Sequence, residues 1–188
     1  MAPLDEFMPL FDVRERFSVV VRAPADVVFE TACAFDMQSL WPVKAILWMR
    51  SAMLGSTPRE RPATGLVDET VALGWGILRR EPGRLVVAGA ICQPWLADVR
   101  FRPIPPGEFA ARLEPDHVKI VWTLEAEPVD ARTTRLSNET RVVGTDEGAR
   151  RRFLRYWRWA RVGIVGIRLI LLPGVRRAAE ARARSLER

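Results

Sequence analysis

The chain has 188 residues, 48% of them hydrophobic, so its length and composition suit one domain with a sizeable core. Its net charge is +6, yet the segment from Ala149 onward carries twelve arginines against two glutamates, which leaves the preceding residues net acidic. The positive charge is therefore local to the C-terminal part, which excludes a uniformly basic protein and favours one basic interaction surface.

The first third of the chain predicts a strand followed by two helices. β-Branched residues mark a strand over Glu15–Ala23, and Pro24 begins a helix over the sequence ADVVFETACAF. A second helix is predicted over Pro42–Leu54, because proline suits the first turn and Gly55 follows the last residue. The next segment, Ser56–Thr64, holds two prolines and mixed charges, which indicate a loop.

The middle of the chain predicts the start of an antiparallel meander. Strand patterns run over Leu66–Pro82 and Arg84–Pro94, and Pro82 with Gly83 between them is a hairpin signal. The prolines of residues 94–106 predict an edge strand or a loop.

Two later segments alternate apolar and polar residues, as antiparallel strands with one covered face do. In His117–Ala126, one face holds Val118, Ile120, Trp122, Leu124 and Ala126. In Thr133–Gly144, one face holds Leu136, Asn138, Thr140 and Val142, and the other holds Glu139. We expect the two segments to pair as a hairpin.

The longest predicted element is a helix over Thr145–Leu172. Its apolar residues recur every three or four positions, at Phe153, Trp157, Ala160, Ile164, Ile167 and Leu171. Thr145 and Asp146 suit its N-terminal cap, and Pro173 with Gly174 predicts a stop or a kink.

This order of elements resembles the START-like superfamily, also called Bet v 1-like or SRPBCC proteins. The opening ERFSVVVRAPADVVFETACAFD and the closing EAEPVDARTTRLSNETRVVGTDEGARRRFLRYW carry the resemblance. It implies an α+β helix-grip fold, in which a curved antiparallel sheet of about six to seven strands wraps around a long C-terminal helix, with two short helices after the first strand. We expect one such domain over residues 1–188, with an N-terminal extension over 1–13 and a basic helical tail over 174–188.

Members of that superfamily enclose an apolar cavity between the sheet and the helix, so the resemblance implies binding of a hydrophobic small molecule or lipid. A cyclase- or dehydratase-like enzyme acting on a polyketide or a similar hydrophobic carbonyl compound is the alternative. The chain shows no catalytic constellation, so a binding protein is favoured over an enzyme. The residues expected to line the cavity are Trp48, Trp75, Val118, Ile120, Trp122, Asn138, Thr140, Phe153, Trp157, Ile164 and Ile167.

Polar residues on the return strand supply the few groups that chemistry could use. Asn138 and Thr140 are expected either to bond an oxygen of the ligand or to satisfy neighbouring side chains. Glu139 is expected on the opposite, exposed face. It is a weak catalytic candidate, because only a β-bulge that reversed the register would turn it into the cavity as a general acid or base.

The sequence predicts neither a metal nor a nucleotide cofactor. His117 is the only histidine and precedes a strand, so a two-histidine metal site is excluded and no convincing histidine-based triad is present. No glycine-rich phosphate-binding loop occurs.

The arginine-rich helix predicts weak contact with an anionic membrane surface, with the loop Ser56–Thr64 as a gate for the ligand. Nucleic acid is the less favoured partner, because no recognition-module signature accompanies the arginines. The run VGIVGIRLILL is too short to span a bilayer alone and contains Arg168. The N-terminus lacks a signal-peptide pattern, so we expect a cytoplasmic location with peripheral membrane contact as the alternative.

Overall fold

The structure is a computed structural model that describes residues 2–55 and 64–188. Its five-stranded antiparallel sheet has the order β1-β5-β4-β3-β2. The strands are β1 (Val13–Val21), β2 (Gly76–Glu81), β3 (Leu85–Cys92), β4 (Val118–Asp130) and β5 (Thr133–Gly144). The helices are α1 (Ala25–Cys33), α2 (Trp41–Leu54), α3 (Leu66–Ala72), α4 (Pro106–Phe109) and α5 (Glu147–Leu186), with a 3-10 turn over Met37–Ser39.

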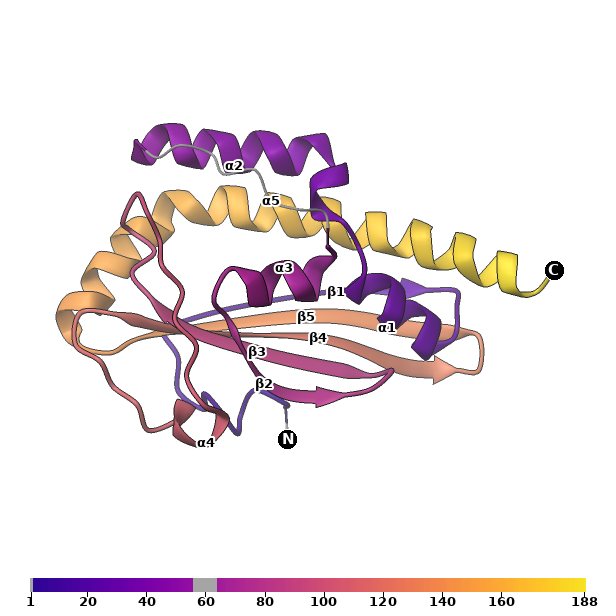
Figure 1. The fold of residues 1–188 in the computed structure, drawn as a ribbon, viewed down its shortest axis with the longest axis horizontal. Helices are drawn as coiled ribbons and strands as arrows, with labels where there is room; N and C mark the ends of the chain where they lie inside the picture. The colour runs from indigo at the N-terminus through magenta and orange to yellow at the C-terminus, as the bar shows by residue number, and fades with distance from the viewer. Residues whose placement is uncertain (1, 56–63) are drawn as a thin grey trace.

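A long C-terminal helix lies along one face of the sheet, which we call the helical face (Figure 1). α1 and α3 lie on the same side, and α2 lies beyond α5. This arrangement is the α+β helix-grip fold that the sequence predicts. None of the described helices is long and apolar enough to cross a membrane.

The strand number is five rather than the expected six or seven, and two predicted strand segments differ from the structure. Leu66–Ala72, predicted as part of a strand, is the helix α3, in which Asp68 and Glu69 fall in the first turn and suit the positive end of the helix dipole. Residues 94–106 contribute only an isolated bridge, between Ile91 and Arg102. The α3 sequence contains β-branched residues, which favour strands, but burial of Leu66 against the helical face outweighs this preference for a strand.

The long helix α5 begins as predicted but does not end at Pro173. The Asp146 carboxylate accepts a hydrogen bond from the backbone N–H of Ala149, at 2.7 Å, and so caps the helix. The helix continues through Pro173 to Leu186, because Val175 and Ala179 beyond the proline are buried. The basic tail expected over residues 174–188 is therefore the end of α5, and it contributes to the core.

The N-terminal extension covers the opposite side of the sheet, which we call the N-terminal face. Leu4, Phe7 and Met8 are almost fully buried there and pack in one apolar cluster with α4 and with strand residues. The strand and α4 members of this cluster are Leu78, Leu85, Val87, Ile91, Val121 and Phe109. Protein thus covers both faces of the sheet, and every residue of β5 except Arg135 is buried or partly buried.

The helical face carries two apolar clusters, one toward each end of α5. The first joins α1 and α3 to the C-terminal half of α5 and includes Val28, Phe29, Val67, Leu136, Leu172 and Val175. The second lies under the N-terminal half of α5 and includes Cys92, Val118, Val142, Phe153, Tyr156 and Ala160. Residues of both clusters line the cavity described next.

Candidate functional site: a cavity between the sheet and the long helix

A cavity of about 1010 Å3 lies between the helical face of the sheet and α5. β4 and β5 form its floor, α5 covers it, and α3 and the connection between β3 and α4 contribute walls. Its volume is at the upper end of the range of small-molecule sites, roughly 300–1,000 Å3. The walls are mostly apolar, with Trp75, Trp122 and Trp157 among them.

Most of the residues predicted from the sequence line this cavity. They are Trp75, Ile120, Trp122, Asn138, Thr140, Phe153, Trp157, Ile164 and Ile167. The prediction that Trp48 and Val118 line it is wrong. Trp48 is 64% exposed, because α2 turns Ile46 instead toward Gly163 and Gly166 of α5. Val118 is fully buried in the packed cluster under Phe153, so no space remains beside it.

A cation that the sequence analysis did not single out as a ligand group lies in the cavity wall. The Arg168 guanidinium donates from Nε to Asn138 Oδ1, at 2.8 Å, and from Nη2 to Thr140 Oγ1, at 2.9 Å. Asn138 in turn donates from Nδ2 to the backbone carbonyl of Thr123, at 2.6 Å. Asn138 and Thr140 therefore satisfy a neighbouring side chain, one of the two roles expected for them, and they fix the direction of the guanidinium.

Burial lowers the pKa of Arg168 to about 10, and the charge of Glu15 acts in the opposite direction. The side chain nevertheless keeps intermediate exposure. The two observations agree, because Arg168 is enclosed by protein while part of its surface faces the cavity. At neutral pH the group still carries its positive charge. Among the described residues it forms hydrogen bonds to neutral groups and no ion pair within 4.0 Å.

Acidic groups also reach the cavity. Glu15 of β1 lines it, and its carboxylate accepts a hydrogen bond from Nε of Arg161, at 2.7 Å. Glu69 of α3 lines it as well and is only 3% exposed. Glu69 was not predicted as a site residue, because the pattern of Leu66–Pro82 indicates a strand whereas Glu69 lies on α3. The cavity therefore has titratable groups on its walls, although most of its surface is apolar.

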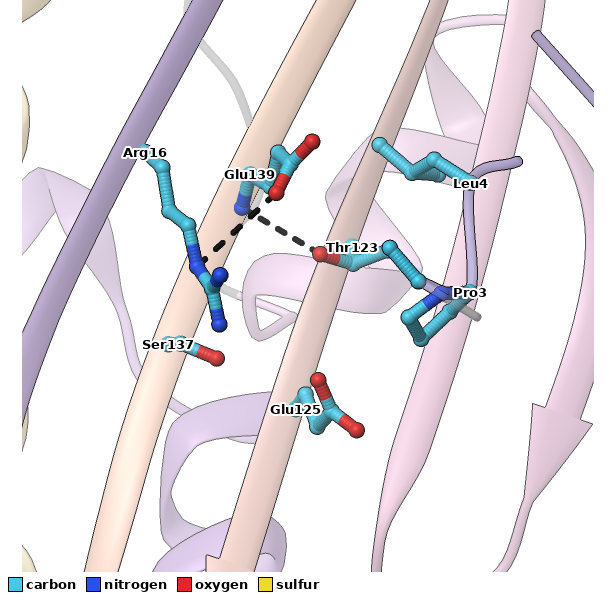
Figure 2. Close-up of a pocket in the computed structure, with 8 residues that line it drawn as sticks. Pro3, Leu4, Arg16, Thr123, Glu125, Ser137 and Glu139 are labelled. Atoms are coloured by element: carbon cyan, nitrogen blue, oxygen red, sulfur yellow. Dashed lines mark hydrogen bonds and ion pairs between the residues drawn. The ribbon is translucent and has the colours of Figure 1, made fainter. Parts of the chain in front are cut away.

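Glu139 lies on the N-terminal face, away from the cavity. Figure 2 shows it with Arg16, Thr123 and Ser137 around a small pocket of about 150 Å3. The register of β4 and β5 is continuous at this position, so no bulge turns Glu139 inward. The expectation that it is exposed is wrong, because the N-terminal extension covers it and leaves it 6% exposed. It cannot act on a molecule bound under α5.

The described residues contain no group of three His, Cys, Asp or Glu side chains placed to hold a metal ion. His117 has its Nδ1 2.7 Å from the carbonyl of Pro115 and its Nε2 3.0 Å from Nη2 of Arg102. It does not line the cavity. Residues 56–63 of the segment predicted as a gate lie outside the described residues, whereas Thr64 lines the cavity.

Fold and cavity together define a helix-grip α+β protein with a mostly apolar cavity between sheet and helix, and Arg168 is the one cation among the described residues that line it. Two solved structures are similar to the chain over most of its length. The ZhuI aromatase/cyclase from Streptomyces sp. R1128 is 16% identical, over 90% of this chain and 94% of that one, with a TM-score of 0.29. TTHA0849 from Thermus thermophilus is 13% identical, over 91% of this chain and 99% of that one, with a TM-score of 0.30. No protein-family model and no curated protein sequence matches the chain.

Proposed function

We propose that the protein binds a hydrophobic small molecule or lipid in the cavity under α5. The observation that carries this proposal is the size of the cavity together with its largely apolar wall. A cavity of this volume in a domain of 188 residues leaves the apolar side chains of its wall facing water instead of protein, which costs stability. An apolar ligand would supply the missing contacts.

The aromatic side chains are placed to hold such a ligand. Trp75 packs against Phe101, with ring centroids 4.9 Å apart, and Phe153 packs against Trp157, with centroids 5.8 Å apart. All four rings line the cavity, so each has a neighbour that fixes it and a surface that faces the chamber. Preformed aromatic walls reduce the entropy that the protein loses when it binds.

A cyclase- or dehydratase-like enzyme is the second candidate, and the titratable groups in the cavity favour it. Glu69, buried on α3, is the residue placed to take a proton from a carbon next to a carbonyl group. Arg168 would stabilise the negative oxygen of the resulting enolate. Glu139 has no part in this mechanism, since it lies on the other face of the sheet.

The neutral fluorescent probe N-phenyl-1-naphthylamine tests the binding proposal, because its emission rises in an apolar environment. We expect saturable binding of one molecule per chain. Native mass spectrometry of protein purified without detergent should show a co-purified molecule that the probe displaces. Absence of probe binding by a folded sample would refute the proposal.

The fate of the co-purified molecule separates the two candidates. A binding protein releases it chemically unchanged after long incubation. An enzyme converts a hydrophobic carbonyl compound, and Glu69→Gln should stop the conversion while leaving probe binding within about twofold of wild type.

A further inference from the structure

Arg168 is a charged side chain that the structure holds in the cavity wall with neutral hydrogen-bond partners. Its position on the inner side of α5 follows from the helix repeat, because Arg168 comes one turn after the cavity residue Ile164. Burying an arginine in an apolar wall costs free energy, so we expect the charge of Arg168 to have a specific role.

The hydrogen bonds of Arg168 leave its outer edge available. A guanidinium has five N–H donors. Nε donates to Asn138, one N–H of Nη2 donates to Thr140, and Nη1 has a long contact of 3.5 Å with the Ile164 carbonyl. Among the described residues, one further N–H on each terminal nitrogen is left for another partner. Two N–H groups on adjacent nitrogens match the two oxygens of a carboxylate.

The surrounding charges limit the ligand to one negative charge. Glu15 and Glu69 line the same cavity, and Glu15 is close enough to influence the pKa of Arg168. Arg161 already pairs with Glu15, at 2.7 Å. A dianionic phosphate would therefore meet one cation and nearby carboxylates, whereas a carboxylate would balance the charge of Arg168.

We infer that the ligand is an apolar molecule that ends in a single carboxylate, which Arg168 binds through its two terminal nitrogens while Asn138 and Thr140 hold the guanidinium in place. This inference rests on the proposed function and adds the chemical class of the ligand. The tail of the molecule would lie against the tryptophans of the cavity, and its head would lie at the polar position on β5.

Displacement of N-phenyl-1-naphthylamine at pH 7.5 by three dodecyl compounds tests the inference. They are dodecanoate, its methyl ester and dodecyl phosphate, which share a chain but differ in head-group charge. We expect dodecanoate to displace the probe at a concentration at least tenfold lower than the ester or the phosphate, since a hydrogen-bonded charge pair adds about this factor. Equal displacement by dodecanoate and the ester, or tighter binding of the phosphate, would overturn the inference.

Substitutions test whether Arg168 is the source of the preference for dodecanoate over its methyl ester. Arg168→Met should reduce the affinity for dodecanoate at least tenfold and leave that for the ester within about twofold, and Arg168→Lys should retain part of the preference. Arg177→Met is the matched control, because Arg177 lies exposed on the same helix. A preference that survives in Arg168→Met would contradict the assignment. If neither the probe nor any dodecyl compound binds to the wild-type protein, the proposed function fails, whereas probe binding without head-group selectivity refutes this inference alone.

A different observation, on the outside of α2 and α5, carries a second inference. The two helices contact each other where Ile46 approaches Gly163. These helices leave large apolar residues in solvent, namely Trp41 (78% exposed), Trp48 (64%), Val162 (78%) and Leu169 (61%), and Val162 also lies at the rim of the cavity. We call this set the outer apolar patch. Tryptophans and aliphatic groups at such exposure are typical of an interaction surface.

Positive charge accompanies the outer apolar patch. Arg151, Arg155 and Arg158 are exposed on α5, at spacings that place them on the same side of the helix as Val162. They form no ion pair with any described residue, whereas Arg150, Arg152 and Arg161 on the same helix each pair with a carboxylate. Unpaired arginines on a helix that also exposes apolar side chains match an anionic lipid surface, which accepts both charge and apolar contacts.

The geometry points to docking of the α2–α5 side on an anionic membrane. Co-sedimentation with vesicles of phosphatidylcholine alone, or with 30% phosphatidylserine, across a salt series tests it. We expect binding only to the anionic vesicles, weakening as salt rises because counterions screen the charges over about 8 Å at physiological ionic strength.

Replacing Arg151, Arg155 and Arg158 together with glutamine should reduce vesicle binding at least tenfold. The matched control is the glutamine triple variant of Arg22, Arg80 and Arg100, which are exposed elsewhere and should leave binding unchanged. Equal binding to both vesicle types, no binding to either, or equal losses in the two triple variants would overturn the inference. So would binding of duplex DNA, at a salt concentration where anionic vesicles do not bind.

Discussion

Replacement of Glu139 by glutamine removes the central charge of a network under the N-terminal extension. The Glu139 side chain is 7% exposed and accepts hydrogen bonds from Nε of Arg14, at 2.9 Å, and from Nε of Arg141, at 2.8 Å. Arg141, itself 4% exposed, also lies 2.9 Å from Asp5 and donates to the Met8 carbonyl, at 2.8 Å. The network thus ties the extension to β5.

Loss of one partner from a buried ion pair typically costs about 3–5 kcal/mol. The lower value applies here, because Arg14 is 42% exposed and can be rehydrated, and Arg141 keeps Asp5. We therefore expect Glu139→Gln to lower the free energy of unfolding by about 3 kcal/mol at pH 7. For a chain of this size, that corresponds to a fall in Tm of about 6–12 °C.

The effect should depend on pH. Burial raises the pKa of Glu139, but the hydrogen bonds from Arg14 and Arg141 outweigh burial, and the pKa of the folded protein lies below its ordinary value. A lowered carboxyl pKa stabilises the folded state above the unfolded-state value, about 4.3, and this contribution is lost as the pH falls through the folded-state value. The difference between wild type and Glu139→Gln should therefore shrink below about pH 4.

Urea denaturation followed by circular dichroism measures this difference. Glu127→Gln is the control, because Glu127 pairs with Arg135 at 3.3 Å while both side chains are about half exposed, so its loss should cost less than about 1 kcal/mol. A cost for Glu139→Gln no greater than that for Glu127→Gln would show that the buried network around Glu139 does not stabilise the fold. Affinity for N-phenyl-1-naphthylamine should be unchanged in Glu139→Gln, since the residue faces away from the cavity.

Three further substitutions test other contacts. Gly89→Ala should destabilise the fold by about 1–3 kcal/mol in a urea titration, because the added Cβ would lie 2.5 Å from Cε2 of Phe109. Gly107→Ala is the control and should change stability little, because its added Cβ would have no atom within 4 Å. Pro173→Ala should stabilise the fold by about 1 kcal/mol, read as a rise in Tm, because it restores a backbone donor inside α5; a fall in Tm would show that the proline is needed there. Asn138→Asp should neutralise Arg168 and reduce displacement of the probe by dodecanoate at least tenfold, with displacement by the methyl ester unchanged; an unchanged response to dodecanoate would argue against Arg168 as the anchor.

Local patterns predict the elements best where one face of a strand or helix is buried. The predicted strand Thr133–Gly144 has the bounds of β5, because its alternation reflects real burial of Leu136 and Val142. The periodicity of the C-terminal helix likewise places Phe153, Ile164 and Ile167 on the cavity. These features depend on residues that are close together in the sequence, so the sequence of one chain is enough to predict them.

Long-range contacts explain what the patterns did not predict. Glu139 is buried by residues more than a hundred positions away, and the alternation of residues in β5 does not indicate that the N-terminal extension covers this face. Pro173 remains inside α5 because Leu172 and Val175 pack on the core, which overrides the local preference for a break. Arg168 had a usable signal, since it falls one turn after Ile164 on the inner side of the helix, and an arginine there suggests a functional role.

A cavity-filling variant tests the central claim, that the ligand binds between the sheet and α5, most directly. Ala160 lies on α5 with 7% exposure and lines the cavity, so Ala160→Trp would occupy it with an indole ring. Leu169→Trp places the same ring on the solvent side of the helix, where Leu169 is 61% exposed. With both variants folded by circular dichroism, we expect Ala160→Trp to bind N-phenyl-1-naphthylamine at least tenfold more weakly than wild type and Leu169→Trp to bind it equally well. Undiminished binding by a folded Ala160→Trp variant would show that the ligand does not bind between the sheet and α5.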